Sequence, residues 1–355
     1  MGTVKGGNFM KTTIYGAADL LNEAPFDHIR RVILEGGLVV FPTETVYGIG
    51  ANALNPGATK KIYDVKGRPS DNPLIVHVAS KEDVKRHVLD VSEEAKQLMD
   101  AFWPGPLTLI FHKNNTIPTQ ITGGLETVAI RCPNHPIAQK ILEKTGLPIC
   151  APSANISGKP SSTLFEHVVG DFDGKVDVIL DGGKSTIGLE STVLDLTTPK
   201  PMLLRPGAIT KRMIEATIGK TVLDGSAAFI EGVPKSPGMK YTHYAPKGRI
   251  TVIFGEKKAV VKYINDCVKD HVEKKEKVVV LCAAEYESNL SGTEKIVLGS
   301  WNDEAEIASN LFIALRKTDE LGVGFIYIHA FPMDSIGFAT MNRLLKASGY
   351  NVVSV

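Results

Sequence analysis

The sequence lacks the features that mark membrane, secreted and metal-binding proteins. Its 355 residues contain no apolar run near the ~20 residues that a membrane helix needs, and its start lacks the apolar core of a signal peptide. Its four cysteines form no C-x-x-C pair and no spacing typical of a metal site or a disulfide framework. We therefore expect reduced thiols in a cytoplasmic protein that has no membrane contact.

An excess of charge of either sign is also missing. Lys and Arg number 40 and Asp and Glu number 39, so the formal net charge is only +1. Such a balance excludes a general attraction to nucleic acid or to an acidic membrane surface. Any basic site in this chain must therefore be local.

Several familiar motifs are absent or incomplete. No H-E-x-x-H, G-x-S-x-G or kinase signature occurs. Gly182-Gly183-Lys184-Ser185-Thr186 resembles the end of a phosphate-binding P-loop, but the first required glycine would fall at Val178. The segment 48–53 matches the dinucleotide pattern G-x-G-x-x-A only formally, because the segment 42–45 rather than a continuous strand leads into it. We therefore predict no P-loop and no dinucleotide site.

What is present is the composition of an ordinary globular protein, 43% apolar and 22% charged, with a length that favours two domains. Strands mixed with helices predict an α/β architecture with a large sheet in the first 210 residues. The predicted helices are 26–34, 58–65, 81–89, 92–102 and 136–145. The predicted strands are 38–41, 74–78, 107–112, 128–133, 147–150, 176–180, 191–196 and 202–204.

A change of composition divides the chain. The segment 231–246 is rich in Pro, Gly, Lys and aromatic residues, which is typical of a linker. After it a second alternation begins, and it predicts a compact three-layer unit of roughly a hundred residues. Its predicted strands are 250–254, 277–282 and 325–330, and its predicted helices are 257–271, 304–320 and 336–348. The predicted domains are thus 22–212, a linker or lid at 213–249, and 250–355. We expect the first dozen residues to be disordered or to derive from cloning.

Two unusual loops carry the candidate chemistry. In the first loop, Lys66 and Arg68 follow directly after the predicted helix 58–65. Pro69 and Pro73 stiffen this loop, because neither can continue a helix. Fixed ammonium and guanidinium groups of this kind suit a polyphosphate or a carboxylate. The second loop, 150–161, follows a strand and is rich in small hydroxyl and amide residues. For a lone Lys-x-Arg a solvated basic turn would be the better interpretation, and the second loop is what favours a site.

Further polar residues stand at the ends of predicted strands. Because ligands of open α/β sheets gather at strand ends, these residues predict one shared cleft. Taken alone, each of them is better explained as a turn residue, a hydrogen-bonded strand histidine, a cap or a surface cation. Together they offer several cations and many neutral donors, which suits a polyanion and a small polar molecule, with catalysis by positioning and charge stabilisation. The set is Thr43, Thr45, Lys66, Arg68, Asn72, His77, Thr127, Arg131, Ser153, Asn155, Ser191 and Arg205.

These loops and strand ends resemble the motifs of a known protein family. Lys66-Gly67-Arg68 together with Ser153-Ala154-Asn155 resembles the KxR…SxN signature of the YrdC-like family. The blocks at 41–48, 68–74, 103–108 and 203–207 look like other motifs of that family, so the resemblance covers about 25–210. The linker block 236–246 is similar to that of the two-domain members of the threonylcarbamoyl-AMP synthase family.

The resemblance implies a fold and a reaction. The fold would be a YrdC-like twisted mixed sheet with helices and a basic concave cleft, followed by a small Rossmann-like three-layer domain. The reaction would join L-threonine, bicarbonate and ATP into threonylcarbamoyl-adenylate with release of pyrophosphate, which is the first step of the t6A37 modification of tRNA. Mg2+ would enter with the ATP phosphates, without side-chain ligands from the protein.

The resemblance also assigns residues to roles. The catalytic set would be Lys66, Arg68, Ser153 and Asn155. ATP or the adenylate would be held by Lys66, Arg68, Asn72, Thr127, Ser153, Ser161, Arg205 and Tyr244. Threonine would be held by Thr45, His77, Arg131, the Ala151 backbone and Ser191. We also expect the segment 237–246 to fold over the cleft as a lid, with Tyr244 touching the nucleotide.

Two other functions stay open at this stage. The chain could chiefly be a double-stranded RNA or tRNA-binding module, with weak RNA binding as a companion of the synthase reaction. It could also be a carbamoyl-transfer domain of the hydrogenase-maturation type, although the acylphosphatase and zinc-finger segments of those chains are missing. The synthase interpretation adds one protein partner, a downstream threonylcarbamoyl transferase complex.

Overall fold

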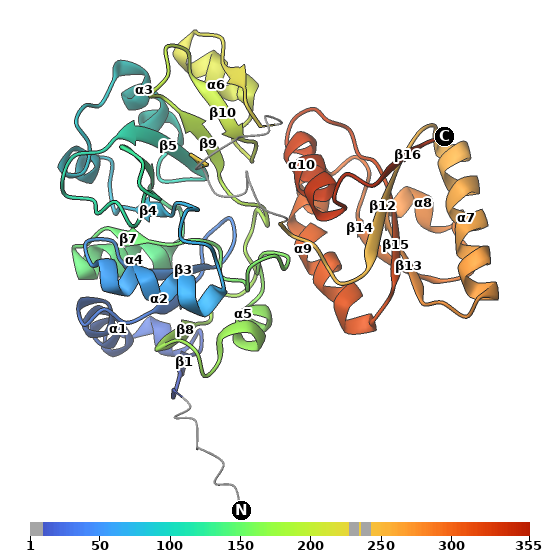
Figure 1. Cartoon of the computed structure of the whole chain (residues 1–355), viewed down its shortest axis with the longest axis horizontal. Coiled ribbons are helices and arrows are strands. Elements are labelled where there is room, and N and C mark those ends of the chain that lie inside the picture. Colours follow the sequence, from blue (N-terminus) through green and yellow to red (C-terminus); the bar gives the residue numbers. More distant parts are fainter. Residues whose placement is uncertain (1–9, 227–233, 236–242) are drawn as a thin grey trace, which may run out of the picture.

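The computed structural model describes residues 10–226, 234–235 and 243–355. The expected disorder of the first dozen residues falls mostly outside this part of the chain, and so does most of the predicted lid, up to residue 242. Figure 1 shows two lobes, each built on its own sheet. The predicted α/β architecture is confirmed.

The first lobe contains an eleven-stranded mixed sheet among the described residues, in the order β1-β8-β2-β3-β7-β4-β6-β5-β9-β10-β11. Its apolar strands are buried on both faces, which explains their continuous Val, Ile and Leu runs. The strands are β1 (Thr13–Tyr15), β2 (Val39–Phe41), β3 (Gly48–Asn52), β4 (Ile75–His77), β5 (Leu107–His112), β6 (Thr127–Arg131), β7 (Ile149–Cys150), β8 (Val178–Leu180), β9 (Thr192–Asp195), β10 (Met202–Arg205) and β11 (Leu223–Asp224).

Helices cover this sheet, and most of them follow their sequence patterns. The helices are α1 (Ala24–Leu34), α2 (Pro56–Lys66), α3 (Glu93–Phe102), α4 (Pro136–Thr145), α5 (Phe165–Phe172) and α6 (Lys211–Ile218), with short 3-10 turns η1 (Asp19–Leu21) and η2 (Glu82–Arg86). The helix predicted at 81–89 is wrong, because only η2 forms there. After it the chain leaves the helical path and Val88 bridges to Lys113 at the sheet.

The segment that formally matched the dinucleotide pattern is the buried strand β3. A Cβ atom on Gly50 would lie 2.6 Å from the Phe41 ring and 2.8 Å from Ile149. Glycine is therefore required here by the close approach of two neighbouring strands and not by a phosphate. The segment is thus a strand and not a glycine-rich turn that opens a helix.

The second lobe has a five-stranded parallel sheet in the order β14-β13-β15-β12-β16. Helices α9 and α10 cover the face toward the first lobe and α7 covers the other, so three layers form as predicted (Figure 1). Strands β14 and β16 were not predicted, because both lie at sheet edges and carry exposed polar residues. The elements are β12 (Arg249–Phe254), α7 (Lys257–Glu273), β13 (Val278–Ala283), α8 (Ala284–Glu287), β14 (Glu294–Gly299), α9 (Glu304–Leu321), β15 (Phe325–His329), α10 (Gly337–Ala347) and β16 (Val352–Ser354).

The two lobes pack against each other through α9 and α10. The apolar core of the second lobe continues across the boundary to Val46 and Leu189 of the first. Arg316 of α9 forms an ion pair with buried Asp171 at 2.7 Å, and Lys184 donates to the Asn310 side chain at 2.6 Å. The second lobe is therefore a fixed wall for the first, although the predicted domain boundaries themselves stay a prediction.

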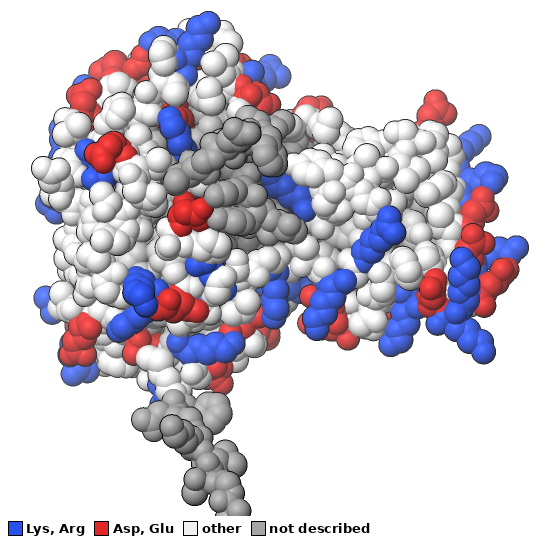
Figure 2. Space-filling view, viewed as in Figure 1, with Lys and Arg blue, Asp and Glu red and all other residues white. Residues whose placement is uncertain are grey.

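The surface carries charges of both signs. On the face drawn in Figure 2, blue and red side chains are interspersed, and in its coloured and white part no broad stripe of one sign appears. None of the helices in the described ranges is both long enough and apolar enough to cross a membrane.

Gly188 tests the packing of the lobes. Its φ is +76°, and a Cβ atom would lie 2.4 Å from the Ser309 Cα and 2.7 Å from the Ser309 carbonyl oxygen. The control is Gly183, which has a similar φ of +70° but open space around it. Both Ala substitutions introduce left-handed strain, so their difference isolates the contact. We expect Gly188→Ala to lower the free energy of unfolding in urea by about 1–3 kcal/mol more than Gly183→Ala; equal values would contradict this packing.

Candidate active site

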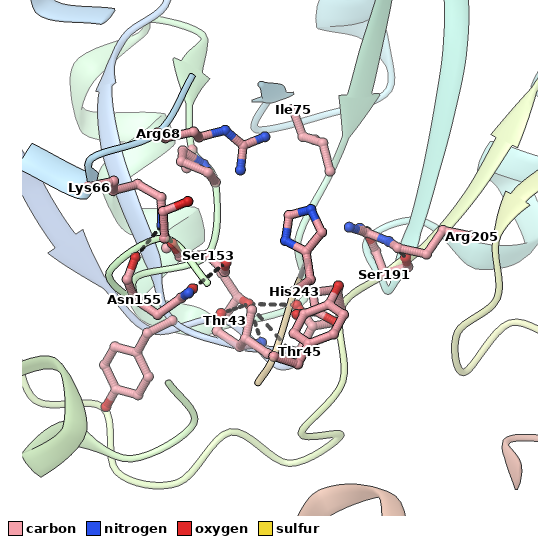
Figure 3. A pocket seen from close by; sticks show the side chains of 18 of the residues that line it. Thr43, Thr45, Lys66, Arg68, Ile75, Ser153, Asn155, Ser191, Arg205 and His243 are labelled. Carbon is pink, nitrogen blue, oxygen red and sulfur yellow. Dashed lines mark hydrogen bonds between the residues drawn. The ribbon is translucent and has the colours of Figure 1, made fainter. Parts of the chain in front are cut away.

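A pocket opens at the ends of the central strands of the first sheet, which is a usual place for small-molecule sites in α/β proteins. Figure 3 shows Lys66 and Arg68 on one side of it and Ser191 and Arg205 on the other. The residues that line it are Thr43, Thr45, Val46, Tyr47, Gly48, Lys66, Arg68, Ile75, His77, Arg131, Ala151, Pro152, Ser153, Asn155, Ser157, Gly158, Glu190, Ser191, Arg205, His243 and Tyr244.

Helix α2 places the first cation. Asn55 caps its N-terminus by accepting from the Gly57 and Ala58 amides, and Gly67 ends it with φ +62°. Lys66, the last helical residue, is buried, and its Nζ donates to the Ser153 carbonyl at 2.5 Å and to the Asn155 carbonyl. Burial, together with the positive charge of nearby Arg68, holds the pKa of Lys66 well below its ordinary value. The ammonium therefore ties the two predicted loops together.

Arg68 is held by main-chain oxygens. Its guanidinium donates to the Pro73 carbonyl at 3.1 Å and to the Asn72 carbonyl at 3.4 Å. Burial of the guanidinium lowers the pKa of Arg68 to about 10. Neutral carbonyls orient this cation without neutralising it, which leaves its charge available to an anion in the pocket.

The second loop is stiffened by its own side chains. The Ser153 hydroxyl donates to the Asn155 side-chain oxygen at 2.6 Å. The Asn155 amide group donates to the Ile156 and Lys159 carbonyls, both at 2.9 Å. Asn155 therefore organises the loop, and Ser153 and Asn155 both line the pocket together with Lys66.

Three polar side chains stand in one row across the sheet. Strand pairing sets His77 of β4 opposite Arg131 of β6, and Arg131 opposite Thr108 of β5. Arg131 donates to the Thr45 hydroxyl at 2.8 Å and lies 2.6 Å from a carboxylate oxygen of buried Glu44. Glu44 was not among the predicted residues; the need of a buried arginine for a counter-charge is the signal that could have found it.

His77 is neutral in this setting. Burial, reinforced by the charge of Arg131, lowers its pKa from 6.5 to about 3. Its Nδ1 atom is buried without a hydrogen-bond partner among the described residues. A buried polar atom without a protein partner is costly, and a bound ligand or an ordered water would complete it.

The opposite wall is built on β9 and β10. Arg205 Nε donates to the Ser191 carbonyl at 3.0 Å and its Nη2 donates to the Ser191 hydroxyl at 3.1 Å. The Ser191 hydroxyl also lies 2.8 Å from that of Thr108. Burial lowers the pKa of Arg205 to about 10. Ser191 is thus fixed from two strands.

The end of the linker reaches the same pocket. Tyr244 lines it with φ +66°, and its ring packs on Phe312 of α9 at 5.1 Å between centroids. Burial raises the pKa of Tyr244 to about 12. His243 lines the pocket as well; burial lowers its pKa to about 3. Tyr244 therefore lines the same pocket as the predicted cations, and His243 is an addition that the sequence analysis did not single out.

Three predicted residues lie outside the pocket lining. Thr127 begins β6 whereas Arg131 ends it, which separates them by about 13 Å along the strand. Asn72 lies beneath Arg68, with its side-chain oxygen buried and unpartnered among the described residues. The Ser161 hydroxyl donates to a carboxylate oxygen of Glu190 at 2.5 Å, one layer behind the pocket wall. The other twelve predicted residues, Thr43 included, line the pocket.

The arrangement favours charge stabilisation. In the parts of the chain that the structure describes, no group of three or more His, Cys, Asp or Glu side chains could hold a metal ion. Both pocket-side acids, Glu44 and Glu190, are already paired with arginines. The pocket can therefore receive a polyanion on its cations and a small polar molecule on its neutral groups.

His77 yields a pH prediction. The unfolded chain binds the His77 proton below pH ~6.5 and the folded chain only near pH ~3, so acidification through this window favours unfolding. We expect His77→Gln to flatten the fall of the unfolding free energy between pH 6.5 and 3, by up to ~1.4 kcal/mol per pH unit. Denaturant titrations at several pH values measure it, with the same substitution at exposed His112 as control. A slope identical to that of the unsubstituted chain would contradict the burial of a neutral His77.

Comparisons with known proteins agree with this geometry. A family model described as telomere recombination matches residues 31–207, and the model of the threonylcarbamoyl-AMP synthase C-terminal domain matches residues 209–349. The threonylcarbamoyl-AMP synthase of Pyrococcus abyssi is 48% identical over 325 residues, which are 91% of this chain and 94% of that protein. The synthase of Bacillus subtilis is 45% identical over 94% of this chain and 95% of its own.

A solved structure covers almost the whole chain. The structure of P. abyssi Sua5 complexed with L-threonine matches with a TM-score of 0.89 and 45% identity, over 98% of this chain and 99% of that one. These matches cover nearly the whole of this chain and of each relative. The similarity therefore extends over both lobes. The chain therefore belongs to the threonylcarbamoyl-AMP synthase family, in its two-domain form.

Proposed function

We propose that this chain condenses L-threonine, bicarbonate and ATP into threonylcarbamoyl-AMP and pyrophosphate, as the first step of the t6A37 modification of tRNA. One observation carries the proposal: a pocket at the strand ends combines oriented cations on both of its sides with neutral hydroxyl and imidazole groups between them. Family membership and the two-domain form agree with it.

The nucleotide belongs to the cationic part of this pocket. The carbamate oxygen attacks the α-phosphorus while the bond to pyrophosphate breaks, so two anions must approach each other. Lys66, Arg68 and Arg205 would lower the cost of that approach by stabilising the negative charge. The residues proposed for ATP or the adenylate remain Lys66, Arg68, Asn72, Thr127, Ser153, Ser161, Arg205 and Tyr244, with Asn155 organising the loop of Ser153.

Threonine belongs beside Arg131. Its carboxylate would pair with that guanidinium, and Ser191 would add a hydroxyl donor. Its side-chain hydroxyl would meet Thr45 and the unpartnered Nδ1 of His77, and a site that hydrogen-bonds a hydroxyl rejects analogues that lack it. The Ala151 N–H already donates to the Ile75 carbonyl, so Ala151 would contribute its carbonyl to the threonine amine. The L-threonine complex of P. abyssi Sua5 supports a threonine site in this fold.

Mg2+ is proposed as a companion of ATP. The described acids near the pocket are engaged by arginines and form no metal cluster. The ion would therefore be held by the phosphate oxygens, and it would add charge neutralisation as pyrophosphate leaves. The side chains of this protein would orient the phosphates without ligating the ion.

The remaining partners follow from the reaction. Carbamate-type products hydrolyse readily, so the adenylate would pass to a downstream threonylcarbamoyl transferase complex. Four free cysteines support a cytoplasmic location. The names of the relatives support the synthase and not the RNA-binding module, and the interspersed charges in Figure 2 do not favour an RNA surface on that face. Weak tRNA binding stays a proposal, and a steep salt dependence of RNA affinity would support it.

Lys66 tests the reaction and the pocket together. We expect pyrophosphate release from ATP to require both L-threonine and bicarbonate, and Lys66→Met to reduce it about 100-fold or more, because a charge that stabilises the transition state is lost. Lys60→Met is the matched control, since Lys60 lies exposed on the same helix and should change the rate little. Release that is indifferent to threonine would point to another ATP-using reaction, and no release at all would favour the RNA-binding module.

Removal of Mg2+ tests its assignment to the phosphates. We expect excess EDTA to stop pyrophosphate release, because the leaving group loses its counter-charge. L-threonine binding in the absence of ATP, measured by calorimetry, should not change, since its proposed contacts are protein side chains. A loss of threonine affinity in EDTA would place the ion on the protein instead.

A further inference from the structure

One residue of the second lobe reaches the wall of the pocket. Arg343 of α10 is 0% exposed. Its Nε donates to a carboxylate oxygen of Glu190 at 2.8 Å, and its Nη2 donates to the Glu190 carbonyl oxygen at 3.3 Å. One planar guanidinium therefore holds both the side chain and the main chain of a residue in the first lobe, which a lysine could not do with the same geometry.

Glu190 transmits this hold into the site. It lines the pocket, and its other carboxylate oxygen accepts from the Ser161 hydroxyl at 2.5 Å. Burial opposes the charge of this carboxylate, but Arg343 and Arg205 hold its pKa below the ordinary value. An anionic Glu190 thus joins Arg343 to Ser161, a residue proposed for the nucleotide.

The same contact fixes the threonine side. Glu190 directly precedes Ser191, whose carbonyl and hydroxyl both accept from Arg205. Because Arg343 holds the Glu190 carbonyl, it restrains the peptide that leads into Ser191. A shift of this peptide would move Ser191 and Arg205 together.

A second arginine shows that the contact is part of a larger clamp. Arg316 of α9 donates to the Pro160 carbonyl at 3.1 Å and to the Ser162 hydroxyl at 2.8 Å, on both sides of Ser161. Two helices of the second lobe thus hold the segments 160–162 and 190–191 of the first lobe. Neither arginine lines the pocket, so each can act only through the residues that it holds.

We propose that Arg343 is a positioning residue of the synthase site, which acts through Glu190 to align Ser161 and Ser191. The proposal rests on the proposed function and deepens it: the second lobe is a part of the active-site scaffold in addition to any role as an anchor of the linker. Stability alone is a poor explanation of the pair, because buried ion pairs are often replaceable by apolar groups without loss of stability.

The kinetic test compares Arg343→Met with Lys184→Met. Lys184 crosses the same interface to Asn310 and Ser309 of α9 and does not line the pocket. We expect Arg343→Met to lower kcat/KM for L-threonine about 10- to 100-fold, as small displacements of reacting groups do, and Lys184→Met to leave it nearly unchanged. Arg343→Lys should recover only part of the loss. A lysine restores the positive charge, but it lacks the planar guanidinium that donates to both the carboxylate and the carbonyl of Glu190. Equal kinetics in Arg343→Met and the unsubstituted chain would overturn the proposal.

The double variant Glu190→Gln/Arg343→Met separates positioning from folding. It removes both charges of the buried pair, so we expect it to unfold at a urea concentration close to that of the unsubstituted chain. Its kcat/KM should nevertheless be as low as that of Arg343→Met, since both changes break one connection and are not additive. A stable double variant with full activity would overturn the proposal.

Amide hydrogen exchange tests the role of Arg343 independently of the proposed reaction, because it needs no substrate. Without substrates, we expect Arg343→Met to speed exchange in the segments 160–163 and 188–192, and Lys184→Met not to. If the unsubstituted chain released no pyrophosphate, the proposed function would fail, but faster exchange in these two segments would still support the clamp. Unchanged exchange in both segments would overturn it even in an active synthase.

Discussion

The structure depends on positive charge that is buried where helix α2 and the strands β6 and β10 end. Lys66, Arg131 and Arg205 are each no more than 4% exposed, and the burial of a single ion costs on the order of several kcal/mol. Main-chain carbonyls, hydroxyls and one carboxylate offset that cost by fixed hydrogen bonds. The same bonds hold the cations in fixed orientations. A polyanionic ligand therefore finds charge that is already oriented, and little reorganisation is left for the moment of reaction.

This constraint also explains why the two lobes are joined so closely. The pocket is formed on the first sheet, but part of its wall is held by α9 and α10 and part by the end of the linker at Tyr244. Tyr244 packs on Phe312 and lies 5.9 Å from the Arg343 guanidinium. Linker, second lobe and pocket wall thus meet at one point, where water can be excluded from an unstable product.

The sequence predicted elements well where periodicity and caps agree. The helix at 136–145 and the strand at 107–112 have the bounds that their patterns indicated. Predictions failed where tertiary contacts outweigh local pattern. The segment 81–89 forms only a 3-10 turn because Val88 pairs with Lys113 at the sheet. Strand β3 was not predicted because its glycines are required by close contacts with Phe41 and Ile149, which lie on other strands.

For the site, the sequence by itself determined the two loops, the cations at the strand ends and the family, because these depend on residue types at short spacing. Only the tertiary structure decided which polar residues meet. It joined Lys66 to the Ser153 loop and His77 to Arg131, left Thr127 at the far end of its strand, and brought in Glu44 and Glu190. The physical reason is that counter-charges come from segments distant in sequence: Arg343 lies 153 residues beyond Glu190, and no local pattern records such a pair.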